Sequence, residues 1–370
     1  MKSVRRRLGQ ALPPLVRRDE RIRTLSAQRR ELQEQLRQSQ STVVRRRELD
    51  EYLSLPSFRR ELVTLRRTTS YLRDLDPHSR HPIRKLLFKL RNYQLAASHG
   101  IAVPDVHAAW MRPEDIDLEE LPEAFVVKSD GGAASRGVLP LRRRDDDRFE
   151  TIDAKILSAE DVRRQFQDLK DRKKVNHPYF AEELLVQPGG MAVPDDVKIY
   201  SFYGEVHEVI LIRRATDQGL GGEQTHRYLS ADATDLGDVM EDHPSDTSIQ
   251  IPPSFSEMME AASHLSKAVG VPFVRVDLFQ TDRGVVFGEL TRAPGGPQYR
   301  TDDHDREMGA AWERAAYRLD MDLIAGRPAG QLHGAHPIPE LYPAAHFSHR
   351  PTARSWQPHV VPCERWCGPT

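Results

Sequence analysis

The sequence predicts an α+β protein in which antiparallel hairpins and helices occupy separate stretches of the chain. Three observations support this prediction. Residues 272–280 and 285–291 have strand-like patterns on either side of a turn sequence, which is typical of a β-hairpin. Residues 125–139 are typical of a strand, a loop of small residues and a second strand. Residues 19–73 are rich in Arg, Glu, Gln and Leu, which favour a helix.

The first hairpin brings two carboxylates together. If its loop has three residues, with Gly284 in the left-handed conformation, Asp277 lies directly opposite Glu289. Opposed like charges destabilise a sheet, and a divalent cation bound by both oxygen ligands would relieve the repulsion. Arg275 and Thr291, one strand period away, would share this face. The alternative is a solvated hairpin face on which both carboxylates contact water.

The loop within residues 125–139 has a composition suited to phosphate. Its Gly, Ala and Ser residues let backbone N–H groups approach a polyphosphate, and Lys128 supplies a positive charge at the end of the first strand. It is not a Walker loop, because no Gly-Lys-Ser/Thr closes it, and it lacks the dinucleotide fingerprint. An ordinary hairpin connection remains the alternative for this loop alone.

Two further segments carry charges inside core-like strands. Residues 179–186 form a short apolar strand that is interrupted by Glu182 and Glu183 and followed by a Pro-Gly-Gly break. Residues 196–214 predict a hairpin around Tyr203-Gly204 with cationic side chains on both arms. Charges in such strands need partners, and pairing with nearby arginines is the structural alternative to a binding role.

In this order the segments resemble the ATP-grasp superfamily, and most closely its TupA-like branch. The resemblance covers about residues 80 to 325. It also includes residues 88–104, a lysine-led helix that ends in Gly-Ile-x-x-Pro. The implied fold is the ATP-grasp fold, in which two α+β subdomains grip ATP. The resemblance is carried by Val127-Lys-Ser-Asp-Gly-Gly-Ala-Ala-Ser-Arg-Gly137, by residues 196–205, by residues 273–279 and by residues 287–296.

The resemblance implies binding sites for ATP and Mg²⁺. Most members of the wider superfamily have asparagine two residues after the metal-binding glutamate, but the TupA-like branch has threonine there, as this chain does. The implied ATP ligands are Lys89 and Lys128 for the α- and β-phosphates, Gly131, Gly132, Ser135 and Gly137 for the β- and γ-phosphates, Glu182, Glu183 and Leu185 for adenine, and Asp196 for the ribose. The implied metal ligands are Asp277, Glu289 and Thr291, and the implied catalytic cations are Lys198, Arg213 or Arg214, and Arg275.

The resemblance also implies a reaction. A carboxylate attacks the γ-phosphate of ATP, and an amine or another nucleophile opens the resulting acyl phosphate. Arg213 or Arg214, and Arg227, are candidates for bidentate binding of the substrate carboxylate. The branch suggests acidic surface polymers, such as uronic-acid polysaccharide or poly-amino-acid material, as the setting. The alternatives are a peptide or amino-acid ligase of natural-product biosynthesis and a non-catalytic nucleotide-binding scaffold.

The expected organisation has five parts. The first, an amino-terminal arm, departs from the family, because the family's usual lead segment is not found at this position. The parts are a basic helical arm at 1–75, a lead segment at 76–122, a small subdomain with the glycine-rich loop at 123–186, a large subdomain with the metal site at 187–330, and a Pro- and His-rich tail at 331–370.

Composition places the chain among globular proteins. It has 370 residues and a mass of 42.3 kDa, with 38% hydrophobic and 29% charged residues, which is enough for two or three domains. No stretch is apolar enough for a membrane span, and residues 8–15 are too broken to be the apolar part of a signal peptide. We therefore expect a cytoplasmic protein.

The net charge of −1 conceals an asymmetry between the arm and the body. Residues 1–75 contain 19 Lys and Arg but 9 Asp and Glu, a net charge of +10 that leaves −11 for the remainder. Ile22, Leu25, Leu32 and Leu36 have helical spacing, which predicts a long helix or a short coiled coil broken near Pro56. The arm has few aromatic residues and no nucleic-acid-binding motif. We expect a homodimer through this helix or docking on a membrane surface, and no nucleic acid.

The end of the chain is rich in Pro and His and has little periodicity. Residues 331–370 are expected to be an extended tail that wraps around the body or remains mobile. Cys363 and Cys367 are too few for a disulfide scaffold. They could bind a metal together with a histidine such as His359, or remain a free reduced pair in a loose tail, which we favour.

Overall fold

The chain divides into two units, Met1–Pro56 and Ser57–Thr370. The computed structural model describes residues 13–75, 81–132, 136–145, 147–188, 194–214, 223–296 and 298–368. Besides loops and a two-stranded parallel sheet, these residues form helices and two antiparallel sheets, so the predicted α+β class is confirmed. Among the described residues, no helix is both long and apolar enough to cross a membrane.

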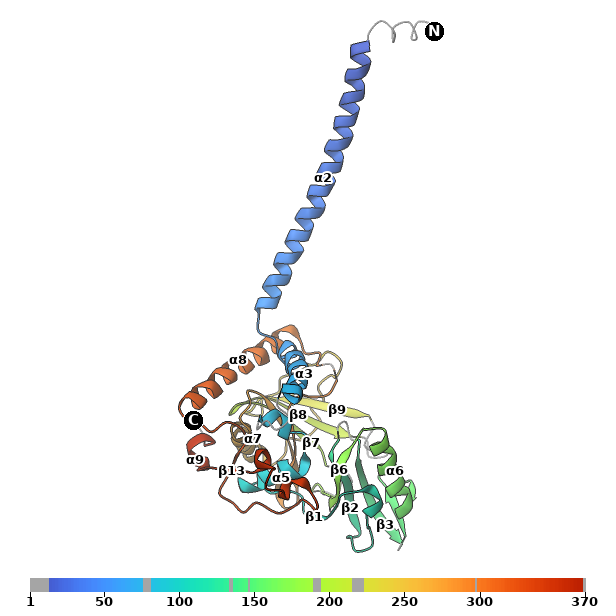
Figure 1. Cartoon of the computed structure of the whole chain (residues 1–370), viewed down its shortest axis with the longest axis vertical. Helices are drawn as coiled ribbons and strands as arrows, with labels where there is room; N and C mark the ends of the chain where they lie inside the picture. Colours follow the sequence, from blue (N-terminus) through green and yellow to red (C-terminus); the bar gives the residue numbers. More distant parts are fainter. Residues whose placement is uncertain are drawn as a thin grey trace. The chain divides into compact units, whose positions relative to one another are not determined.

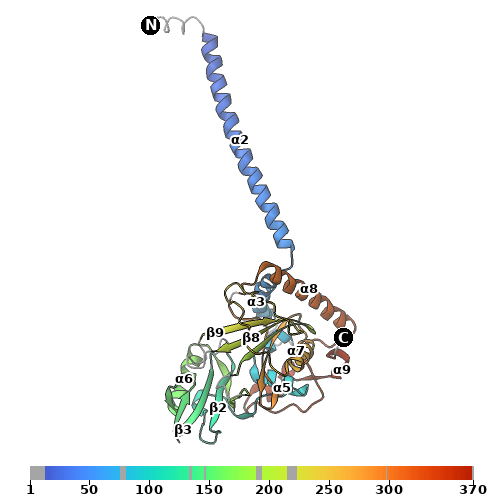
Figure 2. The same cartoon turned by 180° about the vertical axis from the view of Figure 1, so that it is seen from behind.

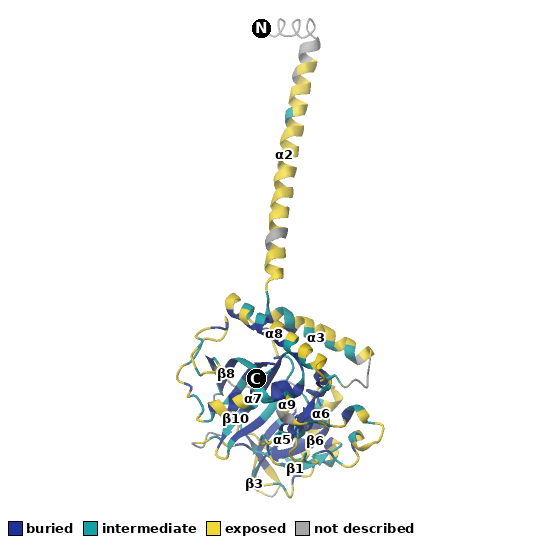
Figure 3. Ribbon diagram, turned by 90° about the vertical axis from the view of Figure 1, so that its left-hand side faces the viewer, coloured by how far each residue is buried: buried dark blue, intermediate teal, exposed yellow. Residues whose placement is uncertain are grey.

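The described part of the first unit is dominated by a single long helix, α2 (Pro13–Ser54) (Figure 1). The side chains that the structure describes in this helix are almost all exposed (Figure 3). The helix ends two residues before Pro56, because the residue that precedes a proline is disfavoured in the helical conformation. The predicted break is therefore confirmed. The next helix, α3 (Phe58–Leu75), belongs to the second unit, so the predicted arm of residues 1–75 spans both units.

The second unit contains a six-stranded sheet in the order β1-β6-β2-β3-β4-β5. Its core includes Phe125, Phe149 and Tyr179, against which Val162 and Phe166 of α6 (Ala159–Asp171) pack. The helix η1 (Pro113–Asp115) lies next to α6. The strands are β1 (Val106–Trp110), β2 (Ala124–Gly131), β3 (Val138–Asp145), β4 (Arg148–Thr151), β5 (Ile156–Ser158) and β6 (Asn176–Glu183).

A five-stranded antiparallel sheet has the order β11-β10-β7-β8-β9. Figure 2 shows β8 and β9 next to each other. The residues of one face pack against the helices α5 (Lys89–Ser98) and α7 (Phe255–Val269). Residues of the opposite face pack against α3 and α8 (Asp302–Ile324). The strands are β7 (Asp196–Phe202), β8 (Glu205–Arg214), β9 (Gln224–Leu229), β10 (Val274–Thr281) and β11 (Gly284–Thr291), and the short helix α4 (Pro82–Lys85) precedes α5.

The β10–β11 hairpin has the predicted pairing of Asp277 with Glu289. The predicted three-residue loop is wrong, because Thr281 pairs with Gly284 and two residues connect the strands. A bulge at Gly288 restores the register. A Cβ atom at Gly288 would lie 2.7 Å from the Phe279 ring and 3.0 Å from the carbonyl oxygen of Asp277, so only glycine fits the bulge.

The described part of the tail packs on the body, which agrees with the first of the two expectations for it. The indole of Trp356 is buried, and the charged ends of Lys85 and Arg91 each lie 4.6 Å from its ring centre. Cys367 is also buried, so the expectation of a loose tail around it is wrong. The tail elements are β12 (Leu332–His333), η3 (Phe347–His349), η4 (Arg354–Trp356), β13 (His359–Val360) and α9 (Cys363–Trp366).

Buried histidines where the tail meets the body predict a loss of stability in acid. Burial lowers the pKa of His333 to about 3 and that of His264 to about 4. His264 Nε2 and His99 Nδ1 lie 2.8 Å apart, so one must donate and the other accept. Because the folded pKa values lie below the unfolded value near 6.5, this stability is fully present above that pH and falls as the pH decreases towards 4.

We expect the free energy of unfolding in urea to decrease steadily from pH 7 to pH 5. Replacing His333 by Asn should flatten this dependence, because one neutral buried imidazole is removed. An exposed histidine offers the control, and His107→Asn should leave the slope unchanged. Equal unfolding free energies at pH 7 and pH 5 in the unmodified protein would contradict the prediction.

Candidate active site

One face of the five-stranded sheet has an apolar half and a charged half. Side chains on a strand alternate between faces, so Tyr200 and Phe202 lie on the same face as Lys198. The aromatic half is covered by Phe58 of α3 and Trp312 of α8. The charged half lies at the other end of β7 and on the neighbouring strands. It contains Asp196, Lys198, Arg214, Arg275, Asp277, Glu289 and Thr291.

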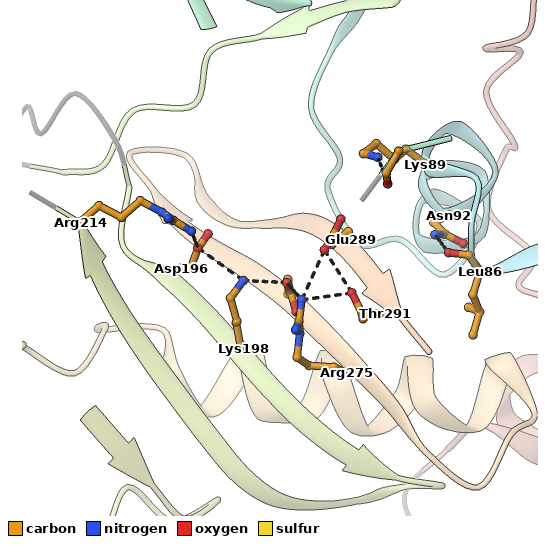
Figure 4. A network of polar contacts seen from close by, with 11 residues as sticks. Leu86, Lys89, Asn92, Asp196, Lys198, Arg214, Arg275, Glu289 and Thr291 are labelled. Carbon is orange, nitrogen blue, oxygen red and sulfur yellow. Dashed lines mark hydrogen bonds and ion pairs between the residues drawn. The ribbon is translucent and has the colours of Figure 1, made fainter. Parts of the chain in front are cut away.

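These charged side chains form one continuous row (Figure 4). Arg214 Nη2 lies 3.0 Å from Asp196 Oδ2, and Lys198 Nζ lies 3.4 Å from the same oxygen. Lys198 Nζ also donates to Asp277 Oδ2 at 2.9 Å. Arg275 binds Asp277 in a bidentate way, with both N–O distances at 2.6 Å. Positive and negative groups therefore alternate across three strands.

Arg275 also connects the two opposed carboxylates. Its Nη2 atom lies 3.3 Å from Glu289 Oε1 and 3.1 Å from the Thr291 hydroxyl, which donates to the same Glu289 oxygen at 3.1 Å. Burial alone would raise the pKa of Asp277, but Arg275 and Lys198 outweigh it and hold this pKa below its usual value. The side chain of Asp277 is 5% exposed, whereas that of Glu289 is 42% exposed. Glu289 is thus the accessible member of the pair.

A second group of charges lies where α5 meets the smaller sheet. Lys128 forms an ion pair with Glu182, which also accepts a hydrogen bond of 2.7 Å from the Tyr93 hydroxyl. Lys89 Nζ donates to the carbonyl oxygen of Gly132 at 3.3 Å. Burial lowers the pKa of Lys89, and the negative charge of Glu289 opposes this shift. Figure 4 shows Lys89 on the α5 side of Glu289. The electrostatic interaction between these two side chains connects the second group of charges to the row on the five-stranded sheet.

The glycine-rich segment has the predicted arrangement of strand, loop and strand. Strand β2 ends at Gly131, and Ser129 N donates to Gly137 O at 2.9 Å, which closes the loop. Gly137 has a left-handed φ of +72°, and a Cβ there would lie 2.5 Å from Ser129 Oγ. Ser135 lies outside the described residues. Lys89 contacts Gly132 in this loop. The binding of phosphate by both stays a prediction.

Three predicted residues lie apart from these groups. Arg213 points to the other face of β8 and binds Asp195, with an Nη2–Oδ2 distance of 2.7 Å. Glu183 accepts a hydrogen bond from Arg283 in the β10–β11 turn at 2.5 Å. Arg227 binds Asp235 and a backbone carbonyl, so its guanidinium has structural partners. Leu185 is buried after the end of β6, and its predicted contact with adenine stays a prediction.

Sequence reasoning missed three buried residues near the glycine-rich loop, namely Asp130, Tyr93 and Tyr342. Asp130 accepts hydrogen bonds from Leu90 N at 2.8 Å and from the Tyr342 hydroxyl at 3.1 Å, so it links the loop to α5 and to the tail. Burial raises the pKa of Asp130 to about 6. Tyr93 is fully buried, and its hydroxyl binds Glu182. A carboxylate inside the loop sequence was the available signal for Asp130, whereas no local pattern distinguishes Tyr93 or Tyr342.

The donor set fits a Mg²⁺ ion that shares its ligands with a nucleotide. Asp277, Glu289 and Thr291 present hard oxygen donors on adjacent strands. Among the described residues, no three His, Cys, Asp or Glu side chains are grouped closely enough to hold a metal. Mg²⁺ in nucleotide sites is usually held by one or two carboxylates together with phosphates and water. Two carboxylates and a hydroxyl match that pattern.

Solved structures with a similar chain path are ligases of low sequence identity. D-alanine–D-alanine ligase from Bacillus anthracis is 17% identical with a TM-score of 0.40, covering 64% of this chain and 68% of that one. The ATP-grasp ligase PsnB with a minimal precursor is 16% identical with a TM-score of 0.37, covering 63% and 61%. L-amino acid ligase from Bacillus licheniformis is 13% identical with a TM-score of 0.36, covering 58% and 42%.

The chain thus spans about two thirds or less of the length of these ligases. No curated protein matches it. The TupA-like ATPgrasp family matches residues 72–313, which include the six-stranded sheet, the five-stranded sheet and both groups of charged side chains. Since this match extends over more than half of the sequence, the chain belongs to the TupA-like ATP-grasp family.

Proposed function

We propose that this protein is an ADP-forming, Mg²⁺-dependent ligase that joins a carboxylate to an amine. The observation that carries the proposal is the row of three cations, Arg214, Lys198 and Arg275, on one sheet face. Lys89 and Lys128 add two more cations on the side of the glycine-rich loop. A polyphosphate undergoing phosphoryl transfer requires fixed positive charges of this kind.

The reaction needs little covalent chemistry from the protein. An oxygen of the substrate carboxylate attacks the γ-phosphorus of ATP, and the bond from that phosphorus to the ADP oxygen breaks. The amine then attacks the carbonyl carbon of the acyl phosphate, and inorganic phosphate leaves with the C–O bond electrons. Asp277 holds Arg275 and Lys198 in position by charge-assisted hydrogen bonds. A Mg²⁺ ion bound by Asp277 and Glu289 would supply further positive charge.

The proposed setting is the synthesis of an acidic surface polymer or conjugate. Arg214 lies at the outer end of the charged row, where it is the candidate to receive the substrate carboxylate. A uronic acid or an acidic amino-acid chain offers such a carboxylate. The support for this setting is the TupA-like family, and the acceptor amine is left to experiment.

The experiment is ADP release from ATP and Mg²⁺, screened against a panel of uronic acids, amino acids and peptides, each with and without amine acceptors. We expect ADP release that depends on one class of carboxylate, together with a product in which carboxylate and amine are joined. ATP binding without release of ADP for any pair in a broad panel would contradict the proposal and favour a nucleotide-binding scaffold.

Two adjacent arginines provide a matched pair of variants. Arg214→Met should lower kcat/KM for ADP release at least about tenfold, because it removes one end of the charged row. Arg213→Met should change it less than about threefold, since this guanidinium lies on the opposite face with Asp195. Steady-state kinetics on both variants check the prediction. Equal losses, or a larger loss for Arg213→Met, would contradict the proposal that the substrate binds on the face of the sheet that carries Arg214.

A further inference from the structure

The long helix α2 carries an apolar seam that is open to solvent. Ile22, Leu25, Leu32, Leu36 and Val43 follow one another at spacings of three, seven, four and seven residues, which keeps them on one line of the helix. Their exposed fractions range from 49% to 64%. A shallow groove lies along the helix between Leu25 and Leu36. An isolated helix with such a seam is stabilised mainly by packing it against a partner.

The residues beside the seam favour a second helix as the partner and disfavour a lipid surface. In the heptad that places Ile22 at a and Leu25 at d, the flanking e and g positions between residues 28 and 40 are neutral. They are occupied by Gln28, Gln33, Gln35 and Gln40. A membrane-surface helix has a wide apolar face bordered by basic residues, whereas a narrow seam with polar borders is typical of a coiled coil.

We propose that α2 pairs with α2 of a second copy in an antiparallel coiled coil centred near Glu34. In this register Leu25 lies opposite Val43, and Leu32 lies opposite Leu36, so apolar residues meet. Each of these layers occurs twice because of the two-fold symmetry.

The charged seam positions decide the orientation. The antiparallel register places Arg18 opposite Asp50, so opposite charges pair in this layer. It places Arg29 opposite the neutral Ser39, so like charges do not meet there. A parallel, in-register pair would place Arg18, Arg29, Asp50 and the arginine at position 46 each against its own copy, which gives four layers of like charge. The antiparallel register has one unfavourable layer, in which Ile22 faces the arginine at position 46.

Cysteine cross-linking in the full chain distinguishes the orientations. The double variant L25C/V43C should form a covalent dimer on mild oxidation, because the two positions oppose each other. L25C alone should not cross-link above the unmodified protein, because two copies of position 25 would lie about 27 Å apart along the helix axis. The unmodified protein serves as the background for Cys363 and Cys367. A dimer from L25C alone would overturn the antiparallel arrangement.

Sedimentation equilibrium tests the association itself. The unmodified chain should be a dimer at micromolar concentration, and Leu36→Glu should raise the dissociation constant at least about 100-fold. Ser41→Glu adds the same charge on the outward side of α2 and should leave the dimer intact. Co-sedimentation with vesicles of phosphatidylserine and phosphatidylcholine provides the second arm. A monomer at all concentrations, or a monomer that binds these vesicles, would overturn the proposal.

Discussion

Replacing Glu289 by Gln should abolish most ADP release while leaving the stability of the protein almost unchanged. The carboxylate is 42% exposed, makes one long contact with Arg275 and accepts a hydrogen bond from Thr291 that an amide oxygen can also accept, so its loss costs less than about 1 kcal/mol of unfolding free energy. The same change removes one of two carboxylates proposed to bind Mg²⁺, and we expect kcat to fall at least about 100-fold. Thermal unfolding without nucleotide, together with ADP release at saturating Mg²⁺, measures both quantities.

Asp277→Asn is the matched variant, and its expected result differs in one respect. ADP release should fall at least as far, but the protein should also lose about 3 kcal/mol of stability. Asp277 is buried between Arg275 and Lys198, and an amide removes the carboxylate closest to both cations. Arg275 then keeps only its longer contact with Glu289, and Lys198 keeps only its longer contact with Asp196. If Glu289→Gln destabilised the protein as much as Asp277→Asn, the two carboxylates would have the same structural role. If both variants retained activity, the proposed metal site would be wrong.

The position of the two carboxylates could be predicted because it depends on local sequence. Turn residues and alternation fix the β10–β11 hairpin, and the side-chain period of two places Arg275 and Thr291 on the face of Asp277. The detail that compensates the shorter loop, the bulge at Gly288, was not predicted. A glycine in a strand has several explanations, and only the neighbouring Phe279 ring shows which one applies.

Other parts of the site depend on contacts between distant segments. Alternation along β8 puts Arg213 and Arg214 on opposite faces, but the sequence alone did not show which face carries the charged row. The pairing of Asp130 with Tyr342 joins residues that are 212 positions apart. Low periodicity in the tail left two expectations open, and aromatic contacts around Trp356 decide between them. None of these three results follows from local propensity.

The ion pair between Arg300 and Glu208 was missed for the same reason, and it predicts the largest loss of stability. Both side chains are fully buried, and Glu208 also lies 2.7 Å from His304 Nε2. Arg300 lies over the rings of Phe58 and Tyr200, with its guanidinium carbon 4.9 and 4.8 Å from their centres. Burial would raise the pKa of Glu208, but Arg300 and His304 lower it to about 2.

Glu208→Gln should therefore destabilise the protein by about 3–5 kcal/mol near pH 7, because a guanidinium cannot lose its proton and would remain buried without a counter-charge. Glu205→Gln is the control on the same strand. Glu205 pairs with partly exposed arginines, and its loss should cost less than about 1 kcal/mol. The double variant Glu208→Leu/Arg300→Met should recover most of the lost stability, because removing both charges leaves neither one uncompensated. Urea unfolding of the four proteins measures these differences, and a double variant no more stable than Glu208→Gln would show that packing, not the uncompensated charge, accounts for the loss.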